Sequence, residues 1–217
     1  MKPLARSDLV ETRLLRNGHV ANARVYLAQA GGRRWTVKDF SDRPWWVRFF
    51  VAPLLLRREL AFIRRLKGVE GVAQEAFLVD ANALAIAYQE GEPLKEMEKT
   101  GYELEYLRKM EALMLAIHAR GVAHMDARGT GNWIVGPGGE AHLIDFQASL
   151  SLNWMPKFLR RAIEAIDISG VYNKWQKAFP ETMTEEQKAE LAYGAKCRSY
   201  WIFHGYGQIK ITRPDGR

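Results

Sequence analysis

Two polar stretches in the second half of the chain carry residue types that phosphoryl transfer requires. In HMDARGTGN, Asp126 could accept or orient the proton of an attacking hydroxyl group, and Asn132 could give an amide oxygen to a metal ion. In HLIDF, Asp145 follows an apolar run, as expected for a carboxylate that binds Mg²⁺ at the end of a strand. We therefore expect Asp126 to be a catalytic base and Asn132 and Asp145 to be Mg²⁺ ligands, with His124 bracing the first stretch.

The spacing of these stretches predicts how they meet. Between Asn132 and Asp145 lie a strand-like run, the turn GPGG and a second strand-like run, so a β-hairpin can bring both residues to one edge. Gly129 and Gly131 lie between Asp126 and Asn132, where their conformational freedom could absorb a bulge in the loop. The alternative is that Asp126 caps a turn and Asp145 ends a strand, with no chemical role for either.

A lysine and a glutamate from the first half of the chain could complete such a site. Lys38 lies near the end of the strand-like run RRWTVKDF, and Glu59 is the lone acid of a helix predicted over residues 54–67. An ion pair between Lys38 and Glu59 would explain an acid among so many arginines. The alternative is an exposed lysine and a surface glutamate that pairs with Arg64.

The elements that must position these residues can be predicted from periodicity and turn signals. The dipeptide GG between two strand-like runs predicts a hairpin, Pro53 can open a helix that Gly68 ends, and Gly121 ends a later one. Thr184 is a plausible N-cap of a final helix. Strand-like runs cover residues 12–16, 23–30, 33–40, 75–80, 83–89, 132–135 and 142–146, and helical patterns cover 54–67, the region from about 102 to 120, and the region after Pro156.

These elements predict an α+β chain with two small lobes. Residues 1–91 would form a β-rich N-terminal lobe with one helix, and residues 92–217 a mainly helical C-terminal lobe. The stretch EGEPL between them has the composition of a linker.

The motifs REL at Glu59, YQEGEPL, HMDARGTGN and LIDF resemble those of the protein-kinase-like superfamily, over about residues 10–150. The resemblance is to the compact atypical branch that includes the RIO kinases and the lipopolysaccharide Kdo/heptose kinases. It implies a two-lobed protein-kinase-like fold, with an antiparallel β N-lobe that binds ATP and a reduced, mainly α C-lobe. It also implies an ATP- and Mg²⁺-dependent kinase with a hydroxyl-bearing acceptor. The implied roles are Lys38 on the ATP phosphates, Glu59 on Lys38, Asp126 as base, Asn132 and Asp145 on Mg²⁺, Arg128 on the transferred phosphate, and Gly18, Val25 and Gln89 in ATP binding.

The second half of the chain departs from the kinase pattern in two places. Asn132 follows Asp126 by six residues instead of five, with Gly131 at the usual position. After the metal-binding aspartate the sequence reads DFQ, with Gln147 instead of glycine, and no APE motif follows. These departures point away from eukaryotic-type signalling kinases.

The glycine-rich loop that covers the phosphates in kinases is reduced to one glycine. In NGHVANARV its register is filled by Gly18, Val20, Ala23 and Val25. The alternative is that this segment is an ordinary hairpin turn without a ligand. Two alternatives to a glycolipid kinase stay open: a RIO-like protein serine/threonine kinase, and a pseudokinase adaptor that binds nucleotide without turnover.

A basic aromatic segment, RPWWVRFFVAPLLLRR at residues 43–58, predicts contact with an anionic surface. Residues 43–67 hold seven basic residues and one acid, so most of the net charge of +7 lies there. We expect this segment to bind the headgroup region of an anionic membrane, and NWMPKFLRR at residues 153–161 to repeat its chemistry. A membrane-embedded acceptor such as a glycolipid sugar would suit it. The alternative is that residues 54–56 and the aromatic side chains pack on the sheet, with solvated arginines. The residues expected to contact lipid are Trp45, Trp46, Phe49 and Phe50.

Composition bounds the remaining possibilities. Cys197 is the single cysteine, so no intrachain disulfide is possible. The N-terminus lacks the apolar core of a signal peptide, and no run reaches the roughly 18 apolar residues of a spanning helix. We expect a cytoplasmic protein, peripheral on the inner face of the membrane. No nucleic-acid-binding motif accompanies the basic charge, so we expect no nucleic-acid partner. The tail from residue 199 supports no prediction.

Overall fold

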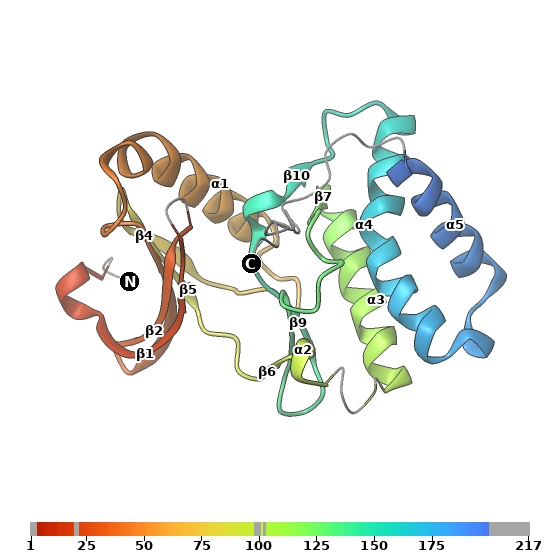
Figure 1. Cartoon of the computed structure of the whole chain (residues 1–217), viewed down its shortest axis with the longest axis horizontal. Helices are drawn as coiled ribbons and strands as arrows, with labels where there is room; N and C mark the ends of the chain where they lie inside the picture. The colour runs from red at the N-terminus through yellow and green to blue at the C-terminus, as the bar shows by residue number, and fades with distance from the viewer. Residues whose placement is uncertain (1–3, 20–21, 98–100, 102, 200–217) are drawn as a thin grey trace, which may run out of the picture.

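The computed structural model describes residues 4–19, 22–97, 101 and 103–199, and its architecture is α+β. A five-stranded antiparallel sheet forms the N-terminal part, in the order β1-β2-β3-β5-β4 (Figure 1). A 3-10 turn, η1 (Arg6–Asp8), precedes it. The strands are β1 (Val10–Asn17), β2 (Arg24–Ala30), β3 (Arg33–Asp39), β4 (Ala76–Asp80) and β5 (Ala83–Ala87).

The β2–β3 hairpin closes as its sequence predicts. Gly31 and Gly32 both have positive φ, 58° and 72°, which is the backbone that a tight hairpin turn needs and that glycine adopts without strain. Within the paired strands Lys38 lies opposite Val25 on β2 and Leu84 on β5. The register therefore fixes Lys38 in a central strand of the sheet.

One helix, α1 (Ala52–Arg65), covers a face of the sheet (Figure 1). It continues without a break from a π-helical turn, η2 (Val47–Val51), and Pro53 is its second residue. Leu56, Leu60 and Ile63 recur at helical spacing and are buried, whereas the arginines between them are mostly exposed. This amphipathic spacing makes α1 a helix and turns one side of it toward the strands.

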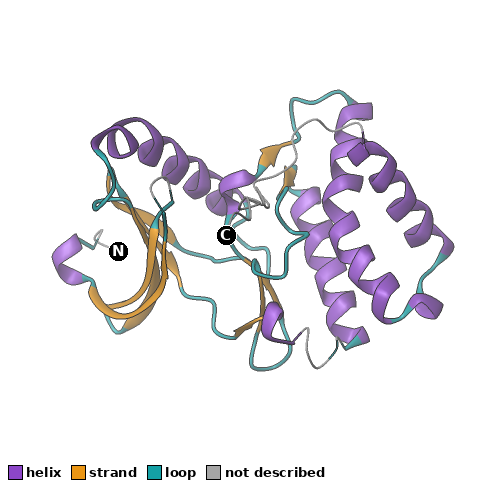
Figure 2. Cartoon of the chain, in the orientation of Figure 1, coloured by secondary structure: helices purple, strands orange, loops and turns teal. Residues whose placement is uncertain are grey.

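The C-terminal part is mainly helical and carries three-stranded and two-stranded sheets (Figure 2). The three-stranded sheet has the order β6-β8-β9, and β7 pairs with β10. Its elements are β6 (Glu92–Pro93), α2 (Leu94–Met97), α3 (Leu104–Ala119), β7 (Val122–Ala123), β8 (Trp133–Val135), β9 (Ala141–Leu143), η3 (Phe146–Ala148), β10 (Leu150–Ser151), α4 (Lys157–Ala178), η4 (Pro180–Thr182) and α5 (Glu185–Ser199).

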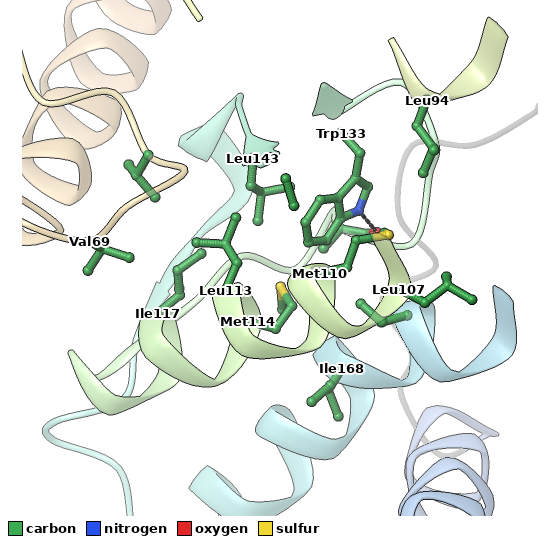
Figure 3. Packing of buried hydrophobic residues seen from close by; sticks show 14 of the residues in the cluster. Val69, Leu94, Leu107, Met110, Leu113, Met114, Ile117, Trp133, Leu143 and Ile168 are labelled. Atoms are coloured by element: carbon green, nitrogen blue, oxygen red, sulfur yellow. Dashed lines mark hydrogen bonds between the residues drawn. The ribbon is translucent and has the colours of Figure 1, made fainter. Parts of the chain in front are cut away.

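The largest core packs around α3. Met110, Met114 and Ile117 point from α3 into a cluster that includes Trp133 of β8 and Ile168 of α4 (Figure 3). Fully burying a side chain of this size contributes about 1.5–3 kcal/mol. The same cluster therefore fixes the loop that precedes β8 against the two helices.

The predicted elements are present, with a few differences. Thr184 does cap α5: its Oγ1 accepts a hydrogen bond from the Gln187 N–H at 3.2 Å, and Gln187 Oε1 accepts one from the Thr184 N–H at 3.0 Å. The stretch EGEPL is not a free linker, because Glu92 and Pro93 pair with β8. Strands β7 and β10 were missed, since two residues are too few to show alternation. No described helix is long and apolar enough to cross a membrane.

Candidate active site

Lys38 is a buried lysine held by a buried glutamate. Its Nζ lies 2.7 Å from Oε1 and 2.9 Å from Oε2 of Glu59, which α1 carries toward the sheet. Lys38 is 5% exposed and Glu59 is fully buried, so the alternative of a surface pair with Arg64 is excluded. The expected ion pair between Lys38 and Glu59 is present.

Asp145 is a second carboxylate on the same lysine. Its Oδ1 lies 2.7 Å from Nζ of Lys38, across 107 residues of sequence. Asp145 follows β9 and has a left-handed backbone, with φ 68° and ψ 69°, a conformation that costs a non-glycine residue free energy. The Lys38 contact thus ties the sheet to the end of the β8–β9 hairpin.

The charges of this group of three residues depend on one another. Burial opposes the charged form of Lys38, but two carboxylates outweigh it and raise the pKa of the lysine. Burial likewise opposes ionisation of Asp145, yet the charge of Lys38 keeps the pKa of Asp145 low. Glu59 is the most deeply buried, and burial raises its pKa against the pull of Lys38. At neutral pH the site therefore keeps a fixed cation beside an ionised Asp145.

Asp126 and Asn132 are joined by direct hydrogen bonds. Asn132 Nδ2 donates to Oδ2 of Asp126 at 2.8 Å and to its carbonyl oxygen at 3.0 Å. The Ile144 N–H donates to the carbonyl oxygen of Asn132 at 3.0 Å, so the β8–β9 hairpin sets Asn132 beside the strand end that leads into Asp145. The expected hairpin is therefore confirmed, and it brings the two expected metal ligands to one edge.

The loop does not use its glycines in the expected way. Neither Gly129 nor Gly131 has a positive φ, and a Cβ added at either would meet no atom within 4 Å. The left-handed residue of this loop is instead Met125, with φ 67°. The prediction of a bulge that requires Gly129 and Gly131 therefore finds no support, because the irregular backbone precedes Asp126.

His124 braces the loop, as expected. It is fully buried, its Nε2 lies 3.0 Å from the carbonyl oxygen of Ile144, and its ring meets Phe146 edge-on at 4.8 Å. A carbonyl oxygen only accepts, so Nε2 carries the proton. Burial lowers the pKa of His124 and keeps the ring neutral. His124 thus links the loop of Asp126 to the strand end before Asp145.

Asp167 anchors the same loop and was missed by the sequence analysis. This buried residue of α4 accepts hydrogen bonds from the backbone N–H groups of His124 at 2.7 Å and Met125 at 2.8 Å, and contacts His118 Nε2 at 3.0 Å. Burial opposes its charge, but these partners hold its pKa low. The available signal was an aspartate between Ile166 and Ile168, in the apolar stripe of a helix.

A cavity of about 440 Å³ lies against this site. Asp126 and His124 do not line the cavity. Asn132 does, and it is hydrogen-bonded to Asp126. Arg13, Leu14, Leu15 and Arg16 of β1 also line the cavity, and sequence reasoning did not single them out. The expected site residues that line it are Val25, Lys38, Glu59, Gln89, Asn132 and Asp145.

Gly18 and Arg128 lie elsewhere. A Cβ on Gly18 would come within 2.4 Å of the Ala23 carbonyl oxygen, so close backbone approach explains this glycine without a ligand. Val20 lies outside the described residues. Arg128 lines a separate hollow of about 320 Å³ with Gly170 and residues of the same face of α4.

The described side chains of the site offer few ligands for a metal ion. In the described ranges no group of three His, Cys, Asp or Glu side chains could hold a metal ion. Carboxylate and amide oxygens of Asp145 and Asn132 suit Mg²⁺, which is commonly held by one or two carboxylates with phosphate oxygens and waters. The residues present therefore fit Mg²⁺ that arrives with a phosphate ligand.

Comparison with known proteins assigns the chain to no family. No protein-family model matches the chain, and no curated protein matches it.

Proposed function

We propose that the chain is an ATP- and Mg²⁺-dependent kinase that phosphorylates a hydroxyl group. One observation carries the proposal: buried Lys38 lies between Glu59 and Asp145 on the wall of a 440 Å³ cavity, with Asn132 on the same wall bonded to Asp126. A cation, oxygen ligands for a metal ion and a hydroxyl-orienting carboxylate are parts that phosphoryl transfer needs.

The proposed fold is two-lobed and protein-kinase-like. A five-stranded antiparallel sheet with one packed helix, followed by a mainly helical part, supports it. In this fold residues 1–91 bind ATP and residues 92–217 carry the catalytic groups.

Each residue has a distinct role in the proposed reaction. Lys38 binds phosphate oxygens, and the carboxylates of Glu59 and Asp145 hold its ammonium group in position before the nucleotide binds. Asp145 and Asn132 would hold Mg²⁺, which neutralises phosphate charge when bound. Asp126 orients the acceptor hydroxyl and takes its proton.

The direct test is ATP consumption with lipopolysaccharide-core precursors and generic protein acceptors side by side. We expect turnover with one class of acceptor and a loss of turnover in Asp126→Ala. ATP turnover that survives unchanged in Asp126→Ala would overturn the proposed mechanism. Transfer to protein alone would favour the RIO-like alternative.

A glycolipid acceptor at an anionic membrane is favoured by an exposed aromatic patch, which consists of η2, the residues before it and the first turn of α1. The exposed fractions of its large side chains are 42–71%. This exposure supports the membrane contact over aromatic packing on the sheet, whereas Leu56 is buried and Leu55 packs against the same core cluster. Trp154 and Phe158, near the start of α4, are 74% and 76% exposed. Arg48 and Arg57 are exposed beside the patch, as anionic lipid requires. The patch comprises Trp45, Trp46, Phe49, Phe50 and Leu54.

Vesicle co-sedimentation tests the membrane contact. We expect binding to phosphatidylglycerol-containing vesicles, weak binding to pure phosphatidylcholine, and loss in a Trp45→Ser/Phe49→Ser/Phe50→Ser variant. Leu115→Ser, which alters an exposed leucine of α3, is the matched control. Vesicle binding that is independent of anionic lipid, or unchanged in the aromatic-patch variant, would contradict the proposed membrane contact.

A nucleotide-binding pseudokinase is the second candidate. It is favoured by the Asp145–Lys38 contact, which engages an expected metal ligand, and by a single glycine where the phosphate-covering loop is expected. ATP binding without turnover on any acceptor would establish it.

A further inference from the structure

Strand β1 is an unusual wall for a cavity. All eight of its residues are exposed, yet Arg13, Leu14, Leu15 and Arg16 border the cavity that contains Lys38. Among the described strands its one neighbour is β2, so it lies at the edge of the sheet. Its side chains therefore form a solvent-exposed wall of the cavity.

A β-bulge explains how both arginines reach the cavity. Residues three apart in a regular strand point to opposite faces of the sheet. In β1 the register shifts between Leu14 and Arg16: Leu14 pairs with Tyr26 and Arg16 with Val25, which leaves Leu15 as an extra residue. Such a bulge re-aims the side chains that follow it. Arg13 and Arg16 thus border the same cavity.

Both arginines are available to an anionic ligand. Across the described residues neither forms an ion pair, whereas Arg24 on the adjacent strand pairs with Glu11 at 2.7 Å. The guanidinium groups of Arg13 and Arg16 and the ammonium group of Lys38 thus line one cavity. Its two carboxylates, Glu59 and Asp145, already contact Lys38.

We propose that Arg13 and Arg16 bind the polyphosphate of the nucleotide, in place of the backbone N–H groups of a glycine-rich loop. The inference rests on the proposed function and names how the same site holds its ligand. A guanidinium fork makes paired, charge-assisted hydrogen bonds to phosphate oxygens. If arginine side chains bind the phosphates, the β1–β2 connection does not need glycines to bring its backbone N–H groups close to them. This is consistent with the single glycine, Gly18, in that connection.

Calorimetric titration of the full chain with MgATP, adenosine and tripolyphosphate tests this. We expect Arg16→Gln to weaken MgATP and tripolyphosphate binding by roughly tenfold or more, and Arg13→Gln to weaken both in the same way. Adenosine binding should stay within about twofold of wild type, because adenosine has no phosphate. Arg24→Gln, which alters an arginine one strand away, should leave all three affinities unchanged.

Thermal unfolding of each variant checks that the exposed strand still folds. Wild-type MgATP affinity in the Arg13→Gln/Arg16→Gln double variant, or an equal loss for adenosine, would overturn the inference and leave the kinase proposal standing. A wild-type chain that binds neither MgATP nor tripolyphosphate would remove both.

Discussion

At the scale of single residues, the site depends on one lysine shared by two acids. The pair of Lys38 and Glu59 was one of two interpretations of the sequence, because Glu59 is the lone acid of a helix rich in arginines, and the structure selects it. The contact of Lys38 with Asp145 could not be predicted, since nothing local reports which residues meet across 107 positions. The left-handed Met125 was equally hidden, because the expectation placed the irregular backbone at glycines.

Removing the lysine should cost stability as well as activity. In Lys38→Met, the buried carboxylate of Glu59 loses its cation, and we expect the free energy of unfolding to fall by about 3–5 kcal/mol. Lys38→Met/Glu59→Gln should recover part of that loss, because the second change removes the unpaired charge. Urea denaturation of Lys38→Met, Glu59→Gln and the double variant measures these losses. A double variant that is destabilised by the full sum of two single losses would contradict the coupling.

At the scale of elements, the loop that carries Asp126 is held by a helix that follows it in sequence. Asp167 of α4 binds the backbone of His124 and Met125, and the ring of His124 binds the carbonyl oxygen of Ile144. The long helices and strands were predictable from apolar periodicity. The anchoring of the loop was not, because one aspartate in α4 carries no local pattern, and β7 and β10 have two residues each.

Replacing Asp167 should loosen this loop. Asn offers one acceptor oxygen where the carboxylate offers two, so Asp167→Asn leaves at least one buried N–H group unpaired, at about 1–3 kcal/mol each. We expect a lower unfolding temperature and faster amide exchange at residues 122–126. Asp126→Asn is a suitable control, because Asp126 is exposed. Unchanged exchange in that segment would contradict the anchoring role.

The same contacts predict acid sensitivity. The pKa of His124 is lowered by burial, so the unfolded chain takes up a proton near pH 6.5 before the folded chain does, and stability falls as pH falls below that value. The pKa of Asp167 is also lowered, so its contribution is present above about pH 4 and is lost in more acidic solution. Unfolding free energies measured from pH 7 to pH 3 should fall in two stages, and Asp167→Asn should flatten the second. A second stage as steep as in wild type would contradict this assignment.

At the scale of the whole molecule, polar contacts join the sheet and α1 to the helical part. Besides the Lys38–Asp145 ion pair, Arg58 Nη2 donates to the carbonyl oxygen of Ser149, and Arg65 Nη1 lies 2.9 Å from Oγ of Ser151. The arginines of α1 therefore serve two purposes: some hold the segment around β10, and others stay exposed beside the aromatic patch.

Ligand binding across this junction should stabilise the whole chain. At a MgATP concentration 100 times its Kd, the free energy of unfolding should rise by about 2.7 kcal/mol, which raises the unfolding temperature by several degrees. In Asp145→Asn we expect ATP to keep a smaller effect that no longer depends on Mg²⁺. A Mg²⁺-dependent shift that persists in Asp145→Asn would show that the metal binds elsewhere.

The rate of phosphate transfer from saturating MgATP to the accepted hydroxyl substrate, in wild type and in Asp126→Asn, tests the central claim most directly. Asp126 is exposed, so the variant should keep its unfolding temperature and its affinity for MgATP. The account predicts transfer by wild type and a rate lower by about 10²–10⁴-fold in the variant. Equal rates in the two proteins, or no transfer by wild type to any hydroxyl acceptor, would contradict it.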